Sequence, residues 1–192
     1  MPPYKKRLFV ALKVTPTTET LQCYNNLRHN CRFFRMRWVE PHLMHLTLKF
    51  FGSTDVNAIP AIKNALAIVA QQTTPFDMEL GQVGVFGSRY APRTLWFGVN
   101  NHEPMQQLFH AINNALQPLG YDPDGGNFVP HLTIARIEQI DDKKLFQKVI
   151  NTFQTEHLQP LHYTRFILYQ SILRPQGPIY KEEAVFDFGK KE

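Results

Sequence analysis

Two near-identical tetrapeptides carry the residues of this sequence that are best suited to chemistry. One is His45-Leu46-Thr47-Leu48, in the first half of the chain, and the other is His131-Leu132-Thr133-Ile134, in the second half. Each lies in a segment of strand-like composition, and residues two apart on a strand point to the same side. In each segment, the histidine and the threonine therefore share one face. The aliphatic residues share the other face, where they can be buried.

Two such strands facing each other across a groove would offer a phosphate two imidazoles and two hydroxyls. A neutral histidine takes a proton from an attacking water or hydroxyl, and a protonated histidine gives one to the leaving oxygen. The motifs predict general acid–base catalysis of phosphodiester transfer by His45 and His131, with Thr47 and Thr133 beside the phosphate. This chemistry needs no metal and no other cofactor. The motifs are too alike for the residues alone to decide which histidine is the acid.

A single His-x-Thr on a strand is more often a hydrogen-bonded structural pair than a functional site. His162-Tyr163-Thr164 is a third copy, but Arg165 follows it where the other two have an aliphatic residue. We interpret it as an ordinary strand segment. The duplication with matching aliphatic spacing favours a functional role for the other two. His42, His45 and His131 lack the carboxylate or cysteine ligands that a metal site would need.

Short apolar strands alternate with amphipathic helices around these motifs. Strands are expected near 8–12, 44–51, 76–86, 94–100, 129–137, 161–173 and 183–188, and 87–93 has the composition of a surface loop. Helices are expected from Thr17 or Thr18 onward, after a cap at Asp55, over roughly 102–117 and near 141–153. Several strand pairs are joined by short turns, which favours an α+β fold with antiparallel sheet over a doubly wound parallel sheet.

Apolar residues at three- and four-residue spacing predict the buried faces of the helices. These residues are Ile59, Ile62, Leu66 and Val69 after Asp55; Met105, Leu108, Phe109, Ile112 and Leu116 in the third helix; and Leu145, Val149 and Phe153 in the fourth.

The composition is that of an ordinary globular chain. Of 192 residues, 43% are hydrophobic and 19% are charged, which excludes a disordered or fibrous chain. The 21 Lys and Arg against 16 Asp and Glu give a net charge of +5, which suits an anionic partner such as RNA. Cys23 and Cys31 exclude a disulfide scaffold and fit a reducing compartment. No apolar run could span a bilayer. We expect a cytoplasmic monomer without membrane contact.

These segments together resemble the two-histidine phosphoesterase superfamily, and specifically the RNA 2′,3′-cyclic phosphodiesterases, also called 2′-5′ RNA ligases. The resemblance covers nearly the whole chain. It rests on Arg7-Leu8-Phe9-Val10-Ala11, Trp38, the segment from His45 to Gly52, Leu95-Trp96-Phe97-Gly98, and the segment from Pro130 to Arg136. It implies a single domain over residues 1–192 with two intertwined lobes. The implied fold is a bilobal, pseudo-twofold α+β duplication, with antiparallel sheets lining a central groove and helices outside.

The resemblance also implies roles for individual residues. His45 would protonate the leaving oxygen and His131 would activate water, so that the bond to the 3′ oxygen breaks and a 2′-phosphomonoester remains. The substrate would be an RNA with a 2′,3′-cyclic phosphate end, and the reverse reaction with a 5′-hydroxyl would make a 2′-5′ linkage. Thr47 and Thr133 match phosphate-contacting threonines, and Arg136 matches an arginine five residues after the second histidine.

Three neighbouring residues have two interpretations each. Arg136 has the opposite strand parity to His131, so it needs a bulge or a strand end to face the phosphate; otherwise it faces solvent. Phe9 resembles a phenylalanine that stacks on a base, but it also suits core packing. Lys49 has the parity of His45, and we expect it to be peripheral.

Three further alternatives remain open. The mixed basic and aromatic segment from Arg32 to Trp38 suits a surface for single-stranded RNA, or equally a loop leading into an edge strand with Trp38 packed inward. An alternative substrate is a small nucleotide, such as a cyclic phosphate of ADP-ribose or a 2′-5′ oligoadenylate. A third class of function is a non-catalytic protein that binds RNA ends.

Overall fold

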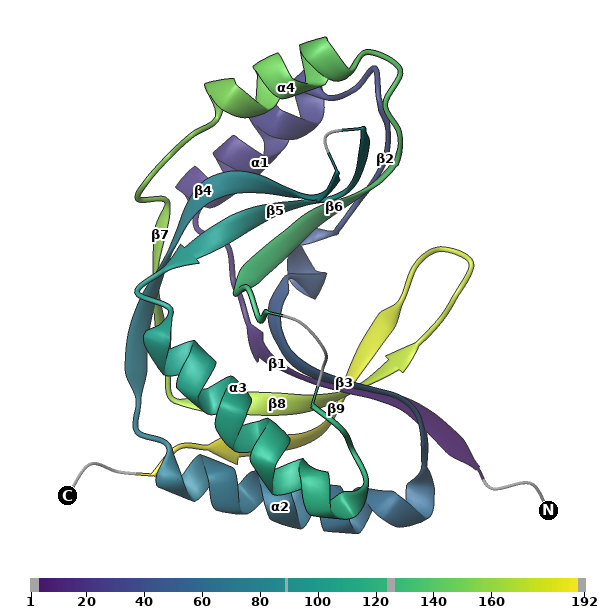
Figure 1. The fold of residues 1–192 in the computed structure, drawn as a ribbon, viewed down its shortest axis with the longest axis vertical. Helices are drawn as coiled ribbons and strands as arrows, with labels where there is room; N and C mark the ends of the chain where they lie inside the picture. Colours follow the sequence, from purple (N-terminus) through teal and green to yellow (C-terminus); the bar gives the residue numbers. More distant parts are fainter. Residues whose placement is uncertain (1–3, 89, 124–126, 190–192) are drawn as a thin grey trace.

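The computed structural model describes residues 4–88, 90–123 and 127–189. Within these ranges the chain forms one nine-stranded sheet, in which every pair of neighbouring strands is antiparallel, and four α-helices (Figure 1). The strands are β1 (Lys5–Lys13), β2 (Arg35–Trp38), β3 (His45–Asp55), β4 (Phe76–Ser88), β5 (Ala91–Asn100), β6 (His131–Gln139), β7 (Gln159–Tyr163), β8 (Arg165–Ile172) and β9 (Ile179–Asp187). The helices are α1 (Thr18–Asn30), α2 (Ile59–Gln72), α3 (Glu103–Leu116) and α4 (Lys143–Thr152). The α+β class with antiparallel sheet is confirmed.

The strand order is β7-β4-β5-β6-β3-β1-β8-β9, and β2 pairs with β6 beside this path. We call β1, β3, β8 and β9 with α2 and α3 the β3 half, and β2 and β4–β7 with α1 and α4 the β6 half. The two helix pairs lie at opposite ends of the curled sheet (Figure 1). The halves meet where β3 runs beside β6.

The predicted caps at Thr17 and Asp55 lie near the helix starts where they were expected, and Asp142 is a cap that was not predicted. The Thr17 hydroxyl accepts a hydrogen bond from the Thr20 amide at the start of α1, and the Asp142 carboxylate accepts one from the Leu145 amide at the start of α4. Asp55 caps the short 3₁₀ turn Val56–Ala58 that leads into α2. All residues predicted to face inward on α2 and α3 are buried.

None of the helices in the described ranges has the length and apolarity needed to cross a membrane.

The predicted inward face of α4 is confirmed in part, because Val149 and Phe153 are partly buried and pack against the core, but it is wrong for Leu145. Phe146 and Ile150 are buried, whereas Leu145 is 42% exposed. Both pairs, 145 with 149 and 146 with 150, have the same four-residue spacing, so the spacing does not choose between them. The choice is made by tertiary packing, because the ring of Phe146 meets the ring of Phe34 edge-on at a centroid distance of 5.4 Å.

Two strand predictions are also wrong in part. The segment 161–173 contains two strands, β7 and β8, which are separated at Thr164. The predicted surface loop over 87–93 is mostly strand, because β4 and β5 pair out to Ser88 and Ala91. Glycine at position 87, with a φ of 112°, allows the register shift that β4 makes there.

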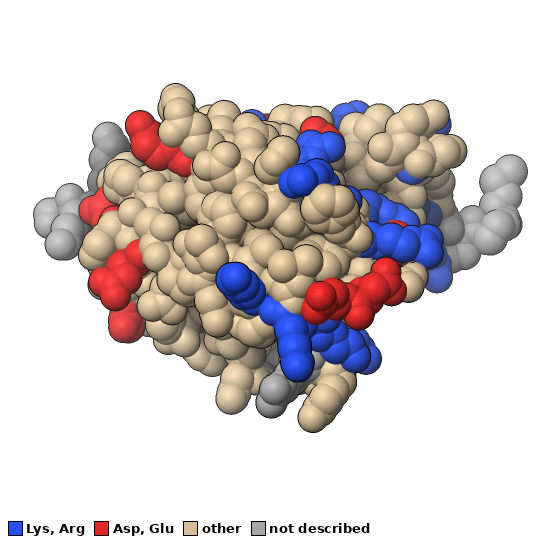
Figure 2. Space-filling view, turned by 90° about the horizontal axis from the view of Figure 1, so that it is seen from above, with Lys and Arg blue, Asp and Glu red and all other residues tan. Residues whose placement is uncertain are grey.

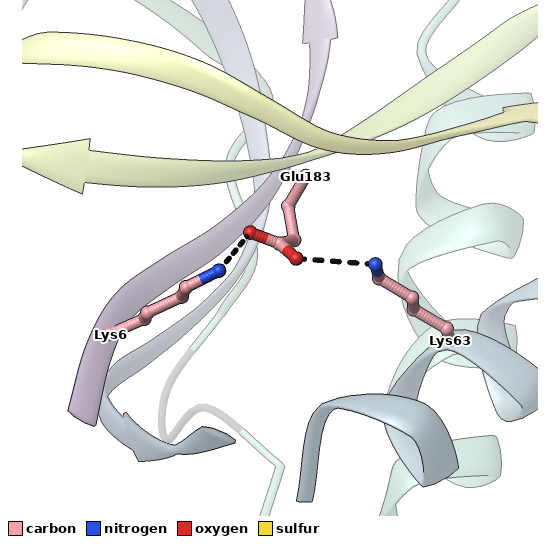
Figure 3. Close-up of polar contacts among 3 residues, drawn as sticks. All are labelled: Lys6, Lys63 and Glu183. Atoms are coloured by element: carbon pink, nitrogen blue, oxygen red, sulfur yellow. Dashed lines mark hydrogen bonds and ion pairs between the residues drawn. The ribbon is translucent and has the colours of Figure 1, made fainter. Parts of the chain in front are cut away.

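An ion cluster of Lys6, Lys63 and Glu183 connects β9 to the rest of the β3 half. The Glu183 carboxylate accepts hydrogen bonds from Lys6 of β1 at 2.7 Å and from Lys63 of α2 at 3.2 Å (Figure 3). The Glu183 side chain is 14% exposed. The cluster therefore links a strand at the end of the sheet both to its interior and to the helix that covers it.

Candidate active site

The two histidine motifs meet at the contact between β3 and β6. Leu46 and Leu132 are directly opposite each other and fully buried. In an antiparallel pair, the flanking residues are then His45 near Thr133 on one side and Thr47 near His131 on the other, all pointing away from the leucines. Diagonal neighbours in such a pair are roughly 7–8 Å apart. The structure thus brings the two histidines and the two threonines together on one face of the sheet.

Both imidazole rings are held by the same hydrogen bond. His45 Nδ1 lies 2.7 Å from the carbonyl oxygen of Leu43, and His131 Nδ1 lies 2.7 Å from the carbonyl oxygen of Val129. A carbonyl oxygen only accepts, so each Nδ1 carries the hydrogen and donates it. This leaves Nε2 as the ring nitrogen that exchanges protons in both residues.

The surroundings lower the pKa of both histidines. Burial is the largest cause for His45 and for His131, and the Arg136 guanidinium lowers the pKa of both further. The ring of His131 also lowers the pKa of His45. The carbonyl hydrogen bonds act in the opposite direction. An anion bound between the rings would oppose these effects and favour a protonated histidine.

Arg136 reaches the histidine face because β6 contains a bulge. Trp96 and Leu95 are consecutive on β5, but their partners on β6 are Thr133 and Ala135, so Ile134 is an extra residue. Beyond the extra residue, each side chain of β6 points to the opposite side from the one expected for an unbroken strand. Arg136 donates a hydrogen bond of 3.4 Å to the Thr94 hydroxyl, and its charge acts on both histidines. The bulge thus places Arg136 on the same side of β6 as His131, which an unbroken strand would not do.

Strand β3 has a matching bulge at Leu48. Val10 and Ala11 are consecutive on β1, but their partners on β3 are Lys49 and Thr47. As a result, Lys49 turns away from the histidine face and is buried, with Nζ 2.6 Å from the carbonyl oxygen of Asp122. The parity expected for Lys49 is therefore wrong. The position that corresponds to Arg136 is occupied by Phe50, which is 54% exposed.

Aromatic residues surround each histidine. The ring of His45 lies 5.0 Å from that of Phe9 and 5.2 Å from that of Tyr180, and Phe9 in turn stacks on Tyr169 at 5.2 Å. The ring of His131 lies 4.6 Å from that of Phe86. Phe9 is only 2% exposed, so in this conformation it packs beneath the site and has no open face for a base.

A cavity of about 170 Å³ opens beside His45. The hairpin of β8 and β9 forms much of its wall, through Tyr169, Ile179 and Tyr180, and Lys13 of β1 also lines it. A larger cavity of about 820 Å³ lies between the β4–β5 hairpin and α4, and none of the predicted site residues lines it. Of these two cavities, the small one adjoins the first motif through His45, and His131 is not among the residues that line it.

Sequence reasoning missed the aromatic neighbours Phe50, Phe86, Tyr169 and Tyr180. Phe50 follows the first motif closely, but it faces the site only because of the bulge at Leu48. The other three come from β4, β8 and β9, whose positions beside the motifs depend on the topology. No local sequence signal marks them.

The third His-x-Thr lies elsewhere. His162 is on β7, at the far end of the strand order from β9, and its Nδ1 is 2.7 Å from the Asp77 carboxylate. It is thus separated from the two motifs and has a carboxylate partner of its own. Among residues 4–88, 90–123 and 127–189, no three His, Cys, Asp or Glu side chains are grouped so that they could hold a metal ion.

Comparison with known proteins defines the class of this fold and site. The curled antiparallel sheet with four helices matches a solved structure from Thermus thermophilus, TT0787, with a TM-score of 0.77 and 22% identity, covering 97% of this chain and 100% of that one. It also matches Escherichia coli LigT complexed with 3′-AMP, with a TM-score of 0.69 and 17% identity, covering 96% of this chain and 99% of that one. These likenesses establish the fold.

The sequence identifies the family. A model of the 2′-5′ RNA ligase superfamily matches residues 11–165, and the chain belongs to that superfamily. A curated relative from Thermotoga maritima, named RNA 2′,3′-cyclic phosphodiesterase, is 33% identical over 150 residues, which are 78% of this chain and 78% of the relative.

Proposed function

We propose that this chain is an RNA 2′,3′-cyclic phosphodiesterase that hydrolyses cyclic phosphate ends to 2′-phosphomonoesters without a metal ion. The observation that carries the proposal is the matched pair of histidines on one face, each with Nδ1 held by a carbonyl and Nε2 left to exchange protons. The name of the curated relatives supports the substrate class.

In the proposed mechanism, His131 acts as the base and His45 as the acid. Nε2 of neutral His131 takes a proton from water, the water oxygen bonds to phosphorus, and the bond from phosphorus to O3′ breaks. Protonated His45 gives its Nε2 proton to O3′, so the products are a 2′-phosphomonoester and a free 3′-hydroxyl. His45 ends neutral and His131 ends protonated, and exchange with solvent restores both. The family resemblance supports this assignment over the reverse one.

Three further residues would hold the phosphate. The hydroxyls of Thr47 and Thr133 share the face of the two histidines, and the Arg136 guanidinium would neutralise charge that develops on the non-bridging oxygens. If an RNA 5′-hydroxyl replaced water as the nucleophile, the same groups in the same roles would form a 2′-5′ linkage: His131 would take the proton of the 5′-hydroxyl, the 5′ oxygen would bond to phosphorus, and the bond to O3′ would break as His45 protonates it.

We also propose that residues 1–192 form one domain of two intertwined lobes, related by a pseudo-twofold axis, with a groove between them. In support, β3 and β6 share the same pattern of burial over their first seven residues. Both strands bulge three residues after the histidine, and both histidines bond the carbonyl two residues earlier. The lobes differ at the position that holds Phe50 in one and Arg136 in the other.

The test is incubation with an oligoribonucleotide ending in a 2′,3′-cyclic phosphate, in the presence of EDTA. Turnover to a product with a 2′-phosphate supports the proposal. Binding without turnover supports an RNA end-binding protein instead. Turnover only of a cyclic phosphate of ADP-ribose or of a 2′-5′ oligoadenylate supports a small-nucleotide enzyme.

A further inference from the structure

Two arginines face each other directly across β2 and β6. Arg37 of β2 is the cross-strand partner of Arg136. Residues directly opposite in an antiparallel pair point to the same side, and like charges in this arrangement destabilise the sheet. Because the bulge at Ile134 places Arg136 on the histidine face, its partner Arg37 also lies on that face, further from the site.

Alternation along β2 places a second arginine on the same face. Arg35 and Arg37 are exposed, whereas Met36 and Trp38 are half-buried and pack against the core, with the Trp38 ring 5.4 Å from that of Tyr24. The edge strand with Trp38 packed inward is confirmed, and the two arginines face outward. Figure 2, seen from the end where α1 and α4 lie, shows Lys and Arg side chains gathered towards one side, with some acidic side chains among them.

The present partners of these arginines are weak competitors for a phosphate. Arg37 forms an ion pair of 2.6 Å with Glu138, but Arg37 is 79% exposed, and exposed ion pairs contribute little. Arg35 makes a hydrogen bond of 3.3 Å to the neutral side chain of Gln139. Both guanidiniums can therefore turn to an anion at small cost.

We propose that Arg35 and Arg37 bind backbone phosphates of the RNA strand upstream of its cyclic phosphate end, so that the strand leaves the site across β2. This proposal rests on the proposed function and makes the substrate a polynucleotide. The arginines are about 7 Å apart along the strand and continue the line of positive charge that begins at Arg136. Upstream phosphates supply the charge complementarity that a mononucleotide lacks.

A structural explanation competes with this one. In the described part of the chain, β2 pairs with β6 alone, and charged residues on an edge strand prevent pairing with other molecules. On that explanation, removal of the arginines changes solubility but not substrate preference.

The experiment compares two substrates in the double variant Arg35→Ala/Arg37→Ala. For an oligoribonucleotide with a 2′,3′-cyclic phosphate end at low salt, we expect kcat/KM to fall by about ten-fold, mainly through KM. For a nucleoside 2′,3′-cyclic monophosphate, we expect no change. The slope of log kcat/KM against log salt should become shallower by about 0.7 for each lost phosphate contact on a single strand.

Arg165→Ala is the matched control. Arg165 is also an exposed strand arginine in an ion pair, with Asp187 at 3.1 Å, but it lies on β8, and β3 and β1 separate β8 from β6. It should leave both substrates unaffected. Equal losses on both substrates, or no loss on the oligonucleotide, would overturn the proposal. If the unaltered protein turns over neither substrate, the proposed function fails. Its affinity for an oligoribonucleotide ending in a 2′-phosphate, measured by fluorescence anisotropy in the same variants, then tests the arginines on their own.

Discussion

His45 and His131 are held in the same orientation by the same kind of bond, from Nδ1 to the carbonyl oxygen two residues earlier, at 2.7 Å in both cases. The bond fixes the tautomer, so Nε2 is presented by both rings. His162 differs, because its Nδ1 bonds the Asp77 carboxylate. A neutral carbonyl thus orients each of the two rings without adding a full negative charge beside the position proposed for an anionic phosphate.

Removal of either imidazole should abolish most turnover. For His45→Ala and His131→Ala, we expect kcat to fall by about 10²–10⁴, because each variant loses one proton transfer. Both variants should remain folded in thermal unfolding, with a small loss of stability because each removes a ring that packs against aromatic neighbours. The matched control is His162→Ala, which removes the third His-x-Thr and should retain full activity. Near-normal kcat in either site variant would refute the assigned roles.

The pH profile of kcat/KM should be bell-shaped. The base, His131, must be neutral, so activity is lost as pH falls below its pKa. The acid, His45, must be protonated, so activity is lost as pH rises above its pKa. Because burial lowers both pKa values, the optimum should lie below the ordinary histidine value of about 6.5. A flat profile measured over about pH 5 to 8 contradicts the scheme, provided that chemistry limits the rate.

Arg136 should influence both rate and pH optimum. Its charge lowers the pKa of both histidines, so Arg136→Met should raise both pKa values and move the optimum of kcat/KM to higher pH. We also expect kcat to fall by about 10²-fold, because charge on the phosphate is no longer neutralised. Arg136→Lys keeps the charge and should keep the optimum. A loss of rate in Arg136→Met without any shift in the optimum would show that the guanidinium is too far from the rings to act on them.

The ion cluster around Glu183 should make stability depend on pH. Hydrogen bonds from Lys6 and Lys63 hold the pKa of Glu183 below its ordinary value. The stabilisation is therefore complete above the unfolded-state pKa and is lost as pH falls through the folded-state pKa. Glu183→Gln should lower the free energy of unfolding by about 1–2 kcal/mol at neutral pH, with a smaller difference in acid.

Urea unfolding at several pH values would measure this effect. Asp187→Asn serves as the control, because its ion pair with Arg165 is exposed and should contribute about 0–1 kcal/mol. Equal effects of the two substitutions at every pH would contradict a special role for Glu183.

The sequence predicts correctly which residues of the two motifs share a face, because two short-range rules suffice there. The period of two on a strand places His45 with Thr47 and His131 with Thr133, and burial of the aliphatic residues fixes which face is which. The inward faces of α2 and α3 follow in the same way from helical spacing. Each of these predictions needs only the identity of residues within a few positions of one another.

The remaining features depend on neighbours that are distant in sequence. The bulges at Leu48 and Ile134 change which residues face the site, and nothing in the motifs marks an extra residue. Tyr180 approaches His45 only because β9 folds back on β8. The buried face of α4 is selected by Phe34, more than a hundred residues earlier in the chain.

Leu46 and Leu132 join the two halves of the sheet through main-chain pairing at a single position. The span between the two imidazoles is consequently fixed by backbone geometry, and no long side chain has to be ordered to maintain it. Under the proposed function, redesign for other ligands would therefore begin at β2, β8 and β9, because substitutions there leave the backbone pairing between the two histidines unchanged.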